Sequence, residues 1–140
     1  MRIDSIKNGI VLDHITAGKG MDIYNALGLS KMDCTVAIIK NVTSRKKGKK
    51  DILKISEVFD IDLDVIGYID PEITVCIIKD GKISTKTKVE LPEKITNVVK
   101  CKNPRCITSV EQELDHVFVL SDRENRIYRC QYCEARQSKY

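Results

Sequence analysis

The pattern of hydrophobic and polar positions predicts that the first part of the chain is rich in β-strands. Residues 9–15 (GIVLDHI) are almost continuously apolar, as expected of a buried strand, and residues 51–58 alternate between apolar and polar positions, as expected of a half-buried one. Asp80-Gly81 separates two further such segments and is typical of two-residue β-hairpin turns. The segments expected to be strands are residues 9–15, 34–42, 51–58, 72–78 and 82–88.

Two segments between these strands have helical periodicity. Residues 18–28 carry Ile23 and Leu27 four positions apart, which places both side chains on one face of a helix. Residues 62–70 form a second, shorter helical segment that ends before Pro71. The order β-α-β-β-α-β-β predicts an α+β fold, a ferredoxin-like sandwich in which an antiparallel sheet carries two helices and one additional strand.

Cysteines are concentrated in the last third of the chain. They form a C-x4-C pair (Cys101 and Cys106) and a C-x2-C pair (Cys130 and Cys133), and two such pairs can supply four thiolates to one tetrahedral Zn²⁺. Four sulfur ligands leave no open coordination position, so the zinc is expected to be structural. The alternatives are two disulfides or four unrelated buried cysteines.

A domain boundary is expected near Leu91-Pro92, because proline has no N–H to donate to a sheet. We therefore expect one domain in residues 1–92 and a second in residues 97–140. The second is too short to bury a sufficient core alone, since domains of less than about 70 residues usually need a metal or disulfides. It is expected to be a small all-β, zinc-ribbon-like domain.

Composition and charge narrow the function classes. The chain has 140 residues, of which 42% are hydrophobic and 31% charged, and its net charge of +4 fits an anionic ligand. No apolar run approaches the roughly 18 residues of a membrane span, and residues 1–9 lack the apolar core of a signal peptide. We therefore expect a soluble cytoplasmic protein with no membrane partner, in a compartment where cysteines bind metal rather than form disulfides.

Asp13-His14 is the candidate binding pair of the first domain. His14 can donate a hydrogen bond to a phosphate, and Asp13 can accept hydrogen bonds from ribose hydroxyls. Lysines, which are good point-charge partners for phosphate, are expected on neighbouring strands. The alternative is that these lysines form only a solvated sheet face. The lysines concerned are Lys50 and Lys54 on one strand and Lys86 and Lys88 on another.

A basic segment, residues 43–50 (TSRKKGKK), is expected to be a solvated loop. It also raises an alternative function, a zinc-ribbon nucleic-acid-binding protein. No aromatic platform for stacking bases accompanies the segment. Residues 111–125, between the two cysteine pairs, are acidic on balance, which argues against a phosphate-binding face there. We therefore expect no nucleic-acid partner.

No catalytic apparatus is expected. No nucleophile motif accompanies Asp13-His14, and neighbours along a regular strand point to opposite faces of the sheet. The two histidines, His14 and His116, fall in different halves of the chain. A metalloenzyme would need an open metal position, which four cysteines do not leave.

Several stretches together resemble the regulatory chain of aspartate carbamoyltransferase. They are IKNGIVLDHITAGKG, GKKDILKI, LPEKITNVVKCKNPRCIT and YRCQYCE, which span nearly the whole chain in the family's order. The combination of I-x-x-G-x-V-x-D-H-I with L-P-E-[KR]-I-x-N-V-x-x-C-x-N-x-x-C is highly specific, whereas neither part is sufficient alone.

The resemblance implies a division of labour between the two domains. The first would be an allosteric nucleotide-binding domain that pairs with a second copy to form a homodimer, and the zinc domain would dock on the separate catalytic chain. In the heterododecamer, regulatory dimers would bridge catalytic trimers. CTP, the end product of pyrimidine biosynthesis, would inhibit, with UTP assisting and ATP opposing it, and the regulatory chain would have no catalytic activity.

The resemblance also implies the roles of individual residues in nucleotide binding. Asp13 would contact the ribose, and His14 and Lys86 would contact the phosphates. Lys54 would reach both ribose and base. The residues that would frame the base are Ile3, Asp4, Ser5 and Ile6.

In the second domain, the resemblance implies that the four cysteines hold the zinc and that Asn103 and Glu134 face the catalytic chain. The sequence departs from the family pattern at several positions. Cys76 and Gly81 stand where the best-known members have an asparagine and a tyrosine near the nucleotide, and Arg105 replaces an asparagine in the zinc loop. These departures bear on effector preference and response, and they leave the zinc ligands unchanged.

Overall fold

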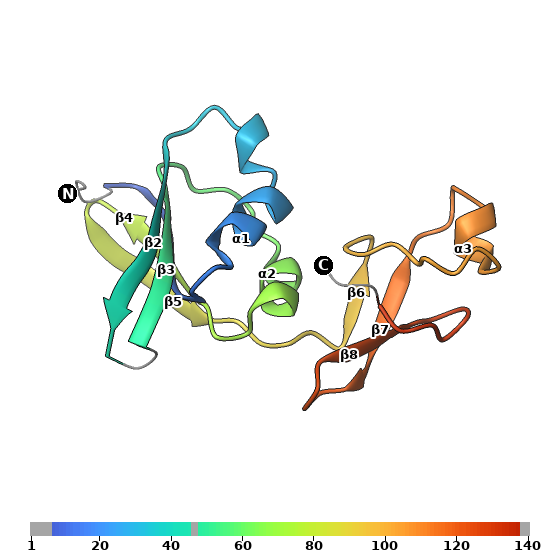
Figure 1. Cartoon of the computed structure of the whole chain (residues 1–140). Coiled ribbons are helices and arrows are strands. Elements are labelled where there is room, and N and C mark those ends of the chain that lie inside the picture. The colour runs from blue at the N-terminus through green and yellow to red at the C-terminus, as the bar shows by residue number, and fades with distance from the viewer. Residues whose placement is uncertain (1–6, 46–47, 138–140) are drawn as a thin grey trace. The chain divides into compact units, whose positions relative to one another are not determined.

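A computed structural model of the chain describes residues 7–45 and 48–137. The chain divides into two compact units, Met1–Glu90 and Leu91–Tyr140 (Figure 1). None of the helices in the described ranges is long and apolar enough to cross a membrane.

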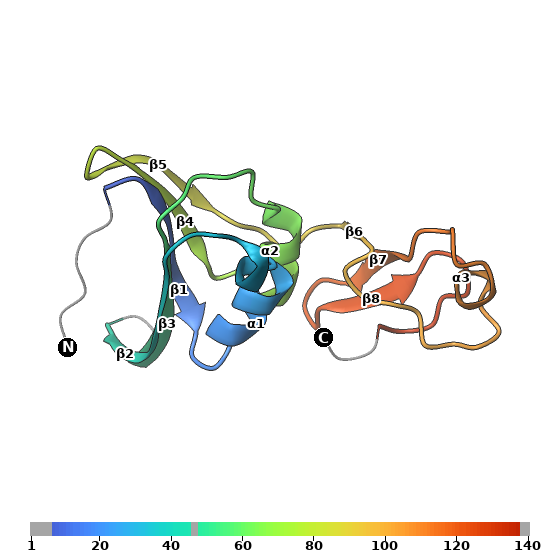
Figure 2. The ribbon, with the colours of Figure 1, turned by 90° about the horizontal axis from the view of Figure 1, so that it is seen from above.

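The first unit is an antiparallel five-stranded sheet with its α-helices on one face (Figures 1 and 2). Its elements are β1 (Gly9–Thr16), α1 (Gly20–Ala26), the 3-10 helix η1 (Leu29–Lys31), β2 (Val36–Ser44), β3 (Gly48–Ile55), α2 (Leu63–Ile69), β4 (Thr74–Lys79) and β5 (Lys82–Lys88). The strand order is β2-β3-β1-β4-β5, and each neighbouring pair is antiparallel. Two interleaved β-α-β units with a strand added at one edge give this order, so the predicted ferredoxin-like α+β fold is confirmed.

The core of the first unit lies between the sheet and the helices. Ile10, Leu12 and Ile15 of β1 are fully buried, and they belong to one cluster with Ile23 of α1 and Ile66 of α2. Burying an aliphatic side chain of this kind contributes roughly 1.5–3 kcal/mol. Because side chains alternate along a strand, the intervening positions of β1 project from the opposite face of the sheet, which the helices do not cover.

The β4–β5 hairpin has the turn predicted from the sequence. Asp80 and Gly81 have φ values of 52° and 78°, and Lys79 pairs with Lys82 on either side of them. A two-residue turn of type I′ requires positive φ at both central positions, which asparagine, aspartate and glycine adopt most readily. The hairpin prediction is therefore confirmed.

Part of the segment predicted as a loop, residues 43–44 and 48–50, instead continues β2 and β3. Thr43 pairs with Lys49 and Ser44 with Gly48, and residues 46–47 lie outside the described ranges. Gly48, the first residue of β3, has a φ of 78°, a conformation that glycine adopts readily. The prediction was wrong because backbone pairing with a neighbouring strand outweighs the low strand propensity of lysine.

The second unit is a small sheet with a short helical turn. Its elements are β6 (Lys94–Thr96), α3 (Ile107–Val110), β7 (Val117–Asp122) and β8 (Ile127–Cys130), and the strands lie in the antiparallel order β6-β7-β8. Phe118 and Tyr128 are its largest fully buried side chains, and the Tyr128 hydroxyl donates a hydrogen bond to the Pro92 carbonyl. The predicted β architecture of this part is confirmed.

Candidate functional site

Asp13 and His14 lie in a β-bulge of β1. The pairing of β1 with β3 shifts between Leu12 and Ile15, so that two residues of β1 face one residue of β3. His14 has a φ of 60°, in the left-handed region that few residues other than glycine adopt. Strained backbone of this kind is concentrated at functional sites, where the surrounding structure holds it in place.

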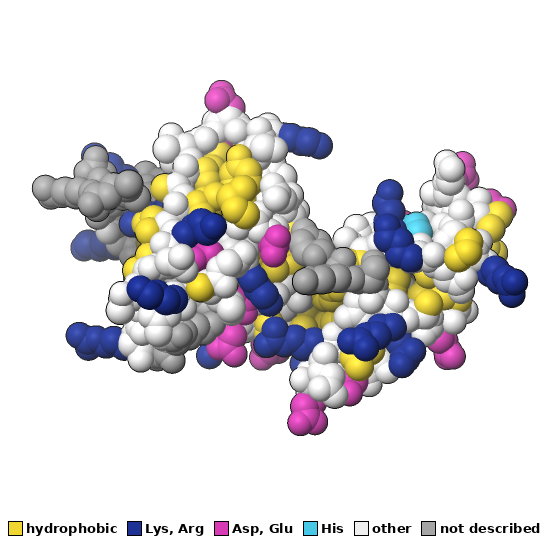
Figure 3. All heavy atoms as spheres, in the orientation of Figure 1, with side chains coloured by type: hydrophobic (Ala, Val, Ile, Leu, Met, Phe, Trp, Pro, Cys, Tyr) yellow, Lys and Arg dark blue, Asp and Glu magenta, His cyan; other side chains and the backbone are white. Residues whose placement is uncertain are grey.

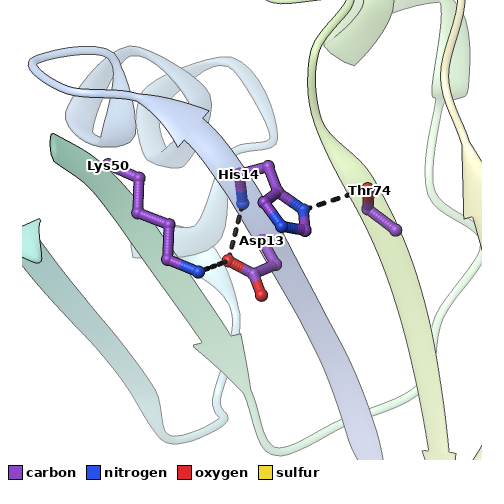
Figure 4. Close-up of polar contacts among 4 residues, drawn as sticks. All are labelled: Asp13, His14, Lys50 and Thr74. Atoms are coloured by element: carbon purple, nitrogen blue, oxygen red, sulfur yellow. Dashed lines mark hydrogen bonds and ion pairs between the residues drawn. The ribbon is translucent and has the colours of Figure 1, made fainter. Parts of the chain in front are cut away.

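The bulge brings the Asp13 and His14 side chains to the same side of the sheet (Figure 4). Asp13 Oδ1 lies 2.9 Å from Lys50 Nζ of β3 and accepts a 2.6 Å hydrogen bond from the His14 N–H. The His14 ring turns the other way, toward β4, where its Nδ1 lies 3.2 Å from the hydroxyl of Thr74, the cross-strand partner of Asp13. The expectation that the two side chains point to opposite faces was wrong, because the bulge interrupts the alternation.

The sequence analysis named Lys50 among the candidate lysines but did not predict its contact with Asp13. The Lys50 side chain is 16% exposed, and that of its partner Asp13 is 29% exposed, so the ion pair is largely shielded from water. The contact depends on the register of β3 against β1, which a single sequence does not reveal. One indication that Lys50 lies at this site was present in the sequence: its spacing from Lys54 places both lysines on one face of β3.

The surroundings of Asp13 hold its pKa below the ordinary value of 3.8. Burial alone raises the pKa of Asp13, but the Lys50 ammonium and the His14 N–H favour the charged form and outweigh burial. Asp13 is therefore a carboxylate at neutral pH and offers acceptor oxygens to a ligand.

Asp13→Asn is expected to show how much this ion pair stabilises the fold. Because the folded-state pKa of Asp13 is lowered, the stabilisation is present above the ordinary pKa and is lost as the pH falls through the lowered value. The substitution should cost about 0.5–1 kcal/mol of unfolding free energy near neutral pH and less below about pH 4. Urea unfolding of both proteins from about pH 3 to pH 7 measures this. The metal centre is common to both, so its own pH dependence cancels, and a difference that grows on acidification contradicts the ion pair.

Lys54 and Lys86 lie in one row across the uncovered face of the sheet. Lys54 of β3 pairs with Val11 of β1, and Cys76 of β4 pairs with both Val11 and Lys86 of β5. Directly opposed residues project from the same face, and strands are about 4.8 Å apart, so the Cα atoms of the two lysines are roughly 14 Å apart. Asp13, two residues after Val11, projects from this face as well. The row offers cations at both ends and apolar side chains between them, which suits a ligand with anionic and flat apolar parts.

The four residues expected to frame a base all lie outside the described ranges. They are Ile3, Asp4, Ser5 and Ile6. Gly81 donates its N–H to the Lys7 carbonyl at 2.8 Å, which holds the chain that follows Ile6 against the β4–β5 hairpin. The Gly81 N–H is thereby engaged within the chain.

Four cysteines of the second unit converge on one point. Their Sγ atoms all lie within 4.8 Å of one another, with Cys101 3.5 Å from Cys133 and Cys106 3.7 Å from Cys130. Sulfurs bound tetrahedrally at about 2.3 Å from Zn²⁺ would be about 3.8 Å apart, whereas a disulfide requires about 2.05 Å. None of the six cysteines, all of them in the described ranges, forms a disulfide. The donor atoms and their spacing fit a tetrahedral metal site.

Cys101, Cys106 and Cys130 differ in how readily their thiols ionise. Hydrogen bonds from the Thr108 hydroxyl and N–H lower the pKa of Cys106 to about 6. Burial raises the pKa of Cys101 to about 12 and also raises that of Cys130. Several thiolates this close together repel one another unless a cation lies among them. The cluster therefore favours a divalent metal ion that binds thiolates.

The loops that carry the cysteines are shaped by hydrogen bonds beside them. Asn103 accepts the Cys106 N–H with its carbonyl and the Arg105 N–H with its side-chain oxygen, both at 3.0 Å. His116 Nδ1 accepts the Cys101 N–H at 3.1 Å, a supporting role that the sequence analysis missed. Glu134 is exposed and has a φ of 64° directly after the last cysteine. Asn103 and Glu134, the predicted interface residues, therefore both lie in the loops of the metal cluster.

Comparison with known proteins finds relatives over both units. Residues 1–90 match the family model for the aspartate carbamoyltransferase regulatory chain, allosteric domain, and residues 93–140 match the model for its metal binding domain. An aspartate carbamoyltransferase regulatory chain from Clostridium botulinum is 54% identical over 134 residues, which cover 96% of this chain and 92% of the relative. A regulatory chain from Bifidobacterium longum is 40% identical and covers 96% of each chain. The matched domains are allosteric and metal-binding rather than catalytic.

Proposed function

Because the chain belongs to the family of aspartate carbamoyltransferase regulatory chains, we propose that its first unit binds a nucleotide effector and that its second unit holds a structural Zn²⁺ and docks on the catalytic chain. The effectors are CTP and ATP, with UTP as a further candidate. Through them the chain controls the first committed step of pyrimidine biosynthesis without taking part in the chemistry.

The observation that carries the nucleotide proposal is the row of side chains from Lys54 to Lys86 beside the bulge at Asp13 and His14. The bulge makes the two ends of this row different. Asp13 turns toward β3, whereas His14 turns toward β4 and the strand beyond it, β5 (Figure 4). The phosphates therefore lie on the β4–β5 side with His14 and Lys86. The ribose hydroxyls donate to Asp13, and the base lies on the β3 side with Lys54.

The proposed docking surface is carried by the loops that the metal ion closes. Asn103 lies in the first loop, and Glu134 follows the second. Ile107 and Val110 of α3, which begins directly after Cys106, are 50% and 67% exposed, and Figure 3 shows hydrophobic side chains at the surface over α3. Exposed apolar side chains rimmed by polar ones are typical of protein–protein interfaces. The zinc ion thus has a structural role, because it holds the surface that contacts the catalytic chain.

In the assembly, the first units of two regulatory chains pair, and these dimers bridge catalytic trimers in a heterododecamer. A nucleotide controls this assembly only if it binds one global state more tightly than the other. Phosphates that bridge His14 on β1 and Lys86 on β5 change how these strands sit, and a preference of about 1–3 kcal/mol for one arrangement suffices for regulation.

Calorimetric titration of the zinc-loaded chain with CTP and with ATP tests the proposal. Saturable binding is expected, and it should be lost in the double variant Asp13→Ala/Lys86→Ala while the zinc content stays unchanged. Asp22→Ala/Lys82→Ala is the matched control, since it removes the same charges from α1 and from the other end of β5. Absence of binding at cellular nucleotide concentrations, or equal binding by the double variant, overturns the assignment. Binding of RNA instead, with an affinity that falls steeply with salt, would indicate the alternative nucleic-acid function.

A further inference from the structure

Asp51 of β3 is a fully buried residue on the helix side of the sheet, opposite Ile15 of the core. Its Oδ2 accepts hydrogen bonds from the N–H groups of Gly18 (3.1 Å) and Gly20 (3.0 Å), and its Oδ1 accepts one from the N–H of Asn41 (3.1 Å). Burial of a carboxylate is costly unless hydrogen bonds replace its hydration, and these backbone donors do so. Asp51 thereby joins β2, β3 and the β1–α1 connection at one point.

Asp51 lies between two β-bulges. One is the β1 bulge that carries Asp13 and His14 and faces β3 directly beside Asp51. The other is in β2 at Asn41, which has a φ of 56° where the β2–β3 pairing shifts in register. An irregular backbone persists only if its polar groups find partners. Asp51 accepts the Asn41 N–H in the β2 bulge directly. It also holds the chain that follows the β1 bulge, through the N–H groups of Gly18 and Gly20.

The same part of β3 presents Lys50 on the opposite face. Because successive side chains alternate across a strand, Asp51 points toward the helices while Lys50 points to the uncovered face, where it pairs with Asp13. A shift of the backbone at Asp51 therefore moves Lys50 and the bulge with it.

We propose that Asp51 is a positioning residue for the effector: through Gly18, Gly20 and Asn41 it fixes the bulge geometry that presents Asp13 and His14. It does not touch the nucleotide itself. This inference rests on the proposed function, because it concerns the same nucleotide site. It adds a buried residue that sets the affinity from the opposite side of the sheet.

The contact between Asp51 and the β1–α1 connection leaves no free space. A Cβ added at Gly20 would lie 2.9 Å from Asp51 Oδ2 and 3.3 Å from its Cβ. Gly20→Ala therefore displaces the carboxylate while leaving it in the sequence, and Asp51→Asn replaces one of its acceptor oxygens with a donor NH₂ group. The two variants disturb the same contact, one from Asp51 and the other from Gly20. If one of them fails to fold, the other still tests the proposal.

Both variants are expected to raise the Kd for CTP about tenfold, which corresponds to about 1.4 kcal/mol. The measurement is calorimetric titration of the zinc-loaded chain at a temperature where each variant is folded. Ile66→Ala is the control, because it opens a cavity in the same core on α2 without belonging to either bulge. It should lower the unfolding temperature and leave the Kd unchanged.

A double-mutant cycle separates positioning from a general loss of stability. In the wild-type background His14→Ala removes a well-placed contact, whereas in the Asp51→Asn background the ring is already displaced. His14→Ala should therefore weaken CTP binding at least threefold less in the second background, an interaction that a purely structural role would not produce.

The possible outcomes distinguish the two proposals. If the wild-type chain binds neither CTP nor ATP, the proposed function fails and this inference fails with it. If the wild-type chain binds CTP and both variants bind it equally well, or if the effects of His14→Ala and Asp51→Asn simply add, Asp51 is not a positioning residue while the proposed function stands. A raised Kd together with the non-additive cycle supports the inference.

Discussion

Removing the metal ion is expected to unfold the second unit and to leave the first unit folded. Structural zinc contributes on the order of 10–16 kcal/mol to the folding of small zinc domains, as much as the whole stability of a typical domain, about 5–15 kcal/mol. The second unit has a small core around Phe118 and Tyr128, which cannot replace that contribution. The four cysteines come from two loops far apart in the sequence, so without the ion nothing comparable ties Cys101 and Cys106 to β8 and its turn.

Amide hydrogen exchange, measured before and after a chelator removes the metal ion, reports this effect separately for each unit. Amides of β7 and β8 should lose protection, those of β1 and β3 should keep it, and binding to catalytic trimers should disappear. Cys133→Ser should weaken metal binding and docking, whereas Cys34→Ser, outside the cluster, should change neither. Chelator saturated with zinc is the control for unspecific effects. A metal-free chain that remains protected in β7 and still docks would contradict the structural role of the metal.

Lys86→Ala and Lys54→Ala are expected to weaken nucleotide binding in different ways. A hydrogen bond to a charged group is worth about 1.5–3 kcal/mol, so loss of the Lys86 contact should raise the Kd for CTP roughly 10- to 150-fold. The same substitution should hardly affect cytidine, which has no phosphate. Lys54→Ala should weaken CTP and cytidine by similar factors, because the proposed contact of Lys54 is with the ribose and base, which the two ligands share.

Titration of both variants with CTP, CMP and cytidine distinguishes these contributions. Lys82→Ala is the matched control, since it removes the same charge from the same strand, β5, at the end next to the hairpin turn. If Lys82→Ala weakens CTP binding as much as Lys86→Ala does, the effect comes from overall charge and not from a phosphate contact. If Lys86→Ala weakens cytidine and CTP alike, the proposed direction of the nucleotide is wrong.

The features that were predicted correctly from the sequence depend on local chemistry. Asp80-Gly81 formed the expected turn because few other dipeptides accept positive φ twice. The cysteine pairs converged because their spacings suit loops that present two thiolates each. The order of strand and helix segments was sufficient to predict the fold class, since few arrangements bury the apolar faces of such a series.

The features that were missed depend on how strands pair. The bulge at Asp13 and His14 exists only against β3, and the Lys50–Asp13 contact follows from the register that the bulge sets. Asp51 resembles any other acid in the sequence, and its role appears only when Gly18 and Gly20 fold back onto β3. None of these contacts leaves a recognisable pattern within one segment, because each joins two segments whose pairing register a single sequence does not reveal.

β5 forms one edge of the five-stranded sheet, and nearly all of its residues are exposed. An exposed edge strand can recruit a strand from another molecule, and lysines along it are a common protection against aggregation. In addition to its proposed contact with phosphate, Lys86 therefore helps to keep this edge strand from pairing with other molecules. Substitutions that alter effector preference are therefore better tolerated at positions of the sheet that do not also protect this exposed edge. Cys76 of β4, which lies in the same row but not on an edge strand, is such a position.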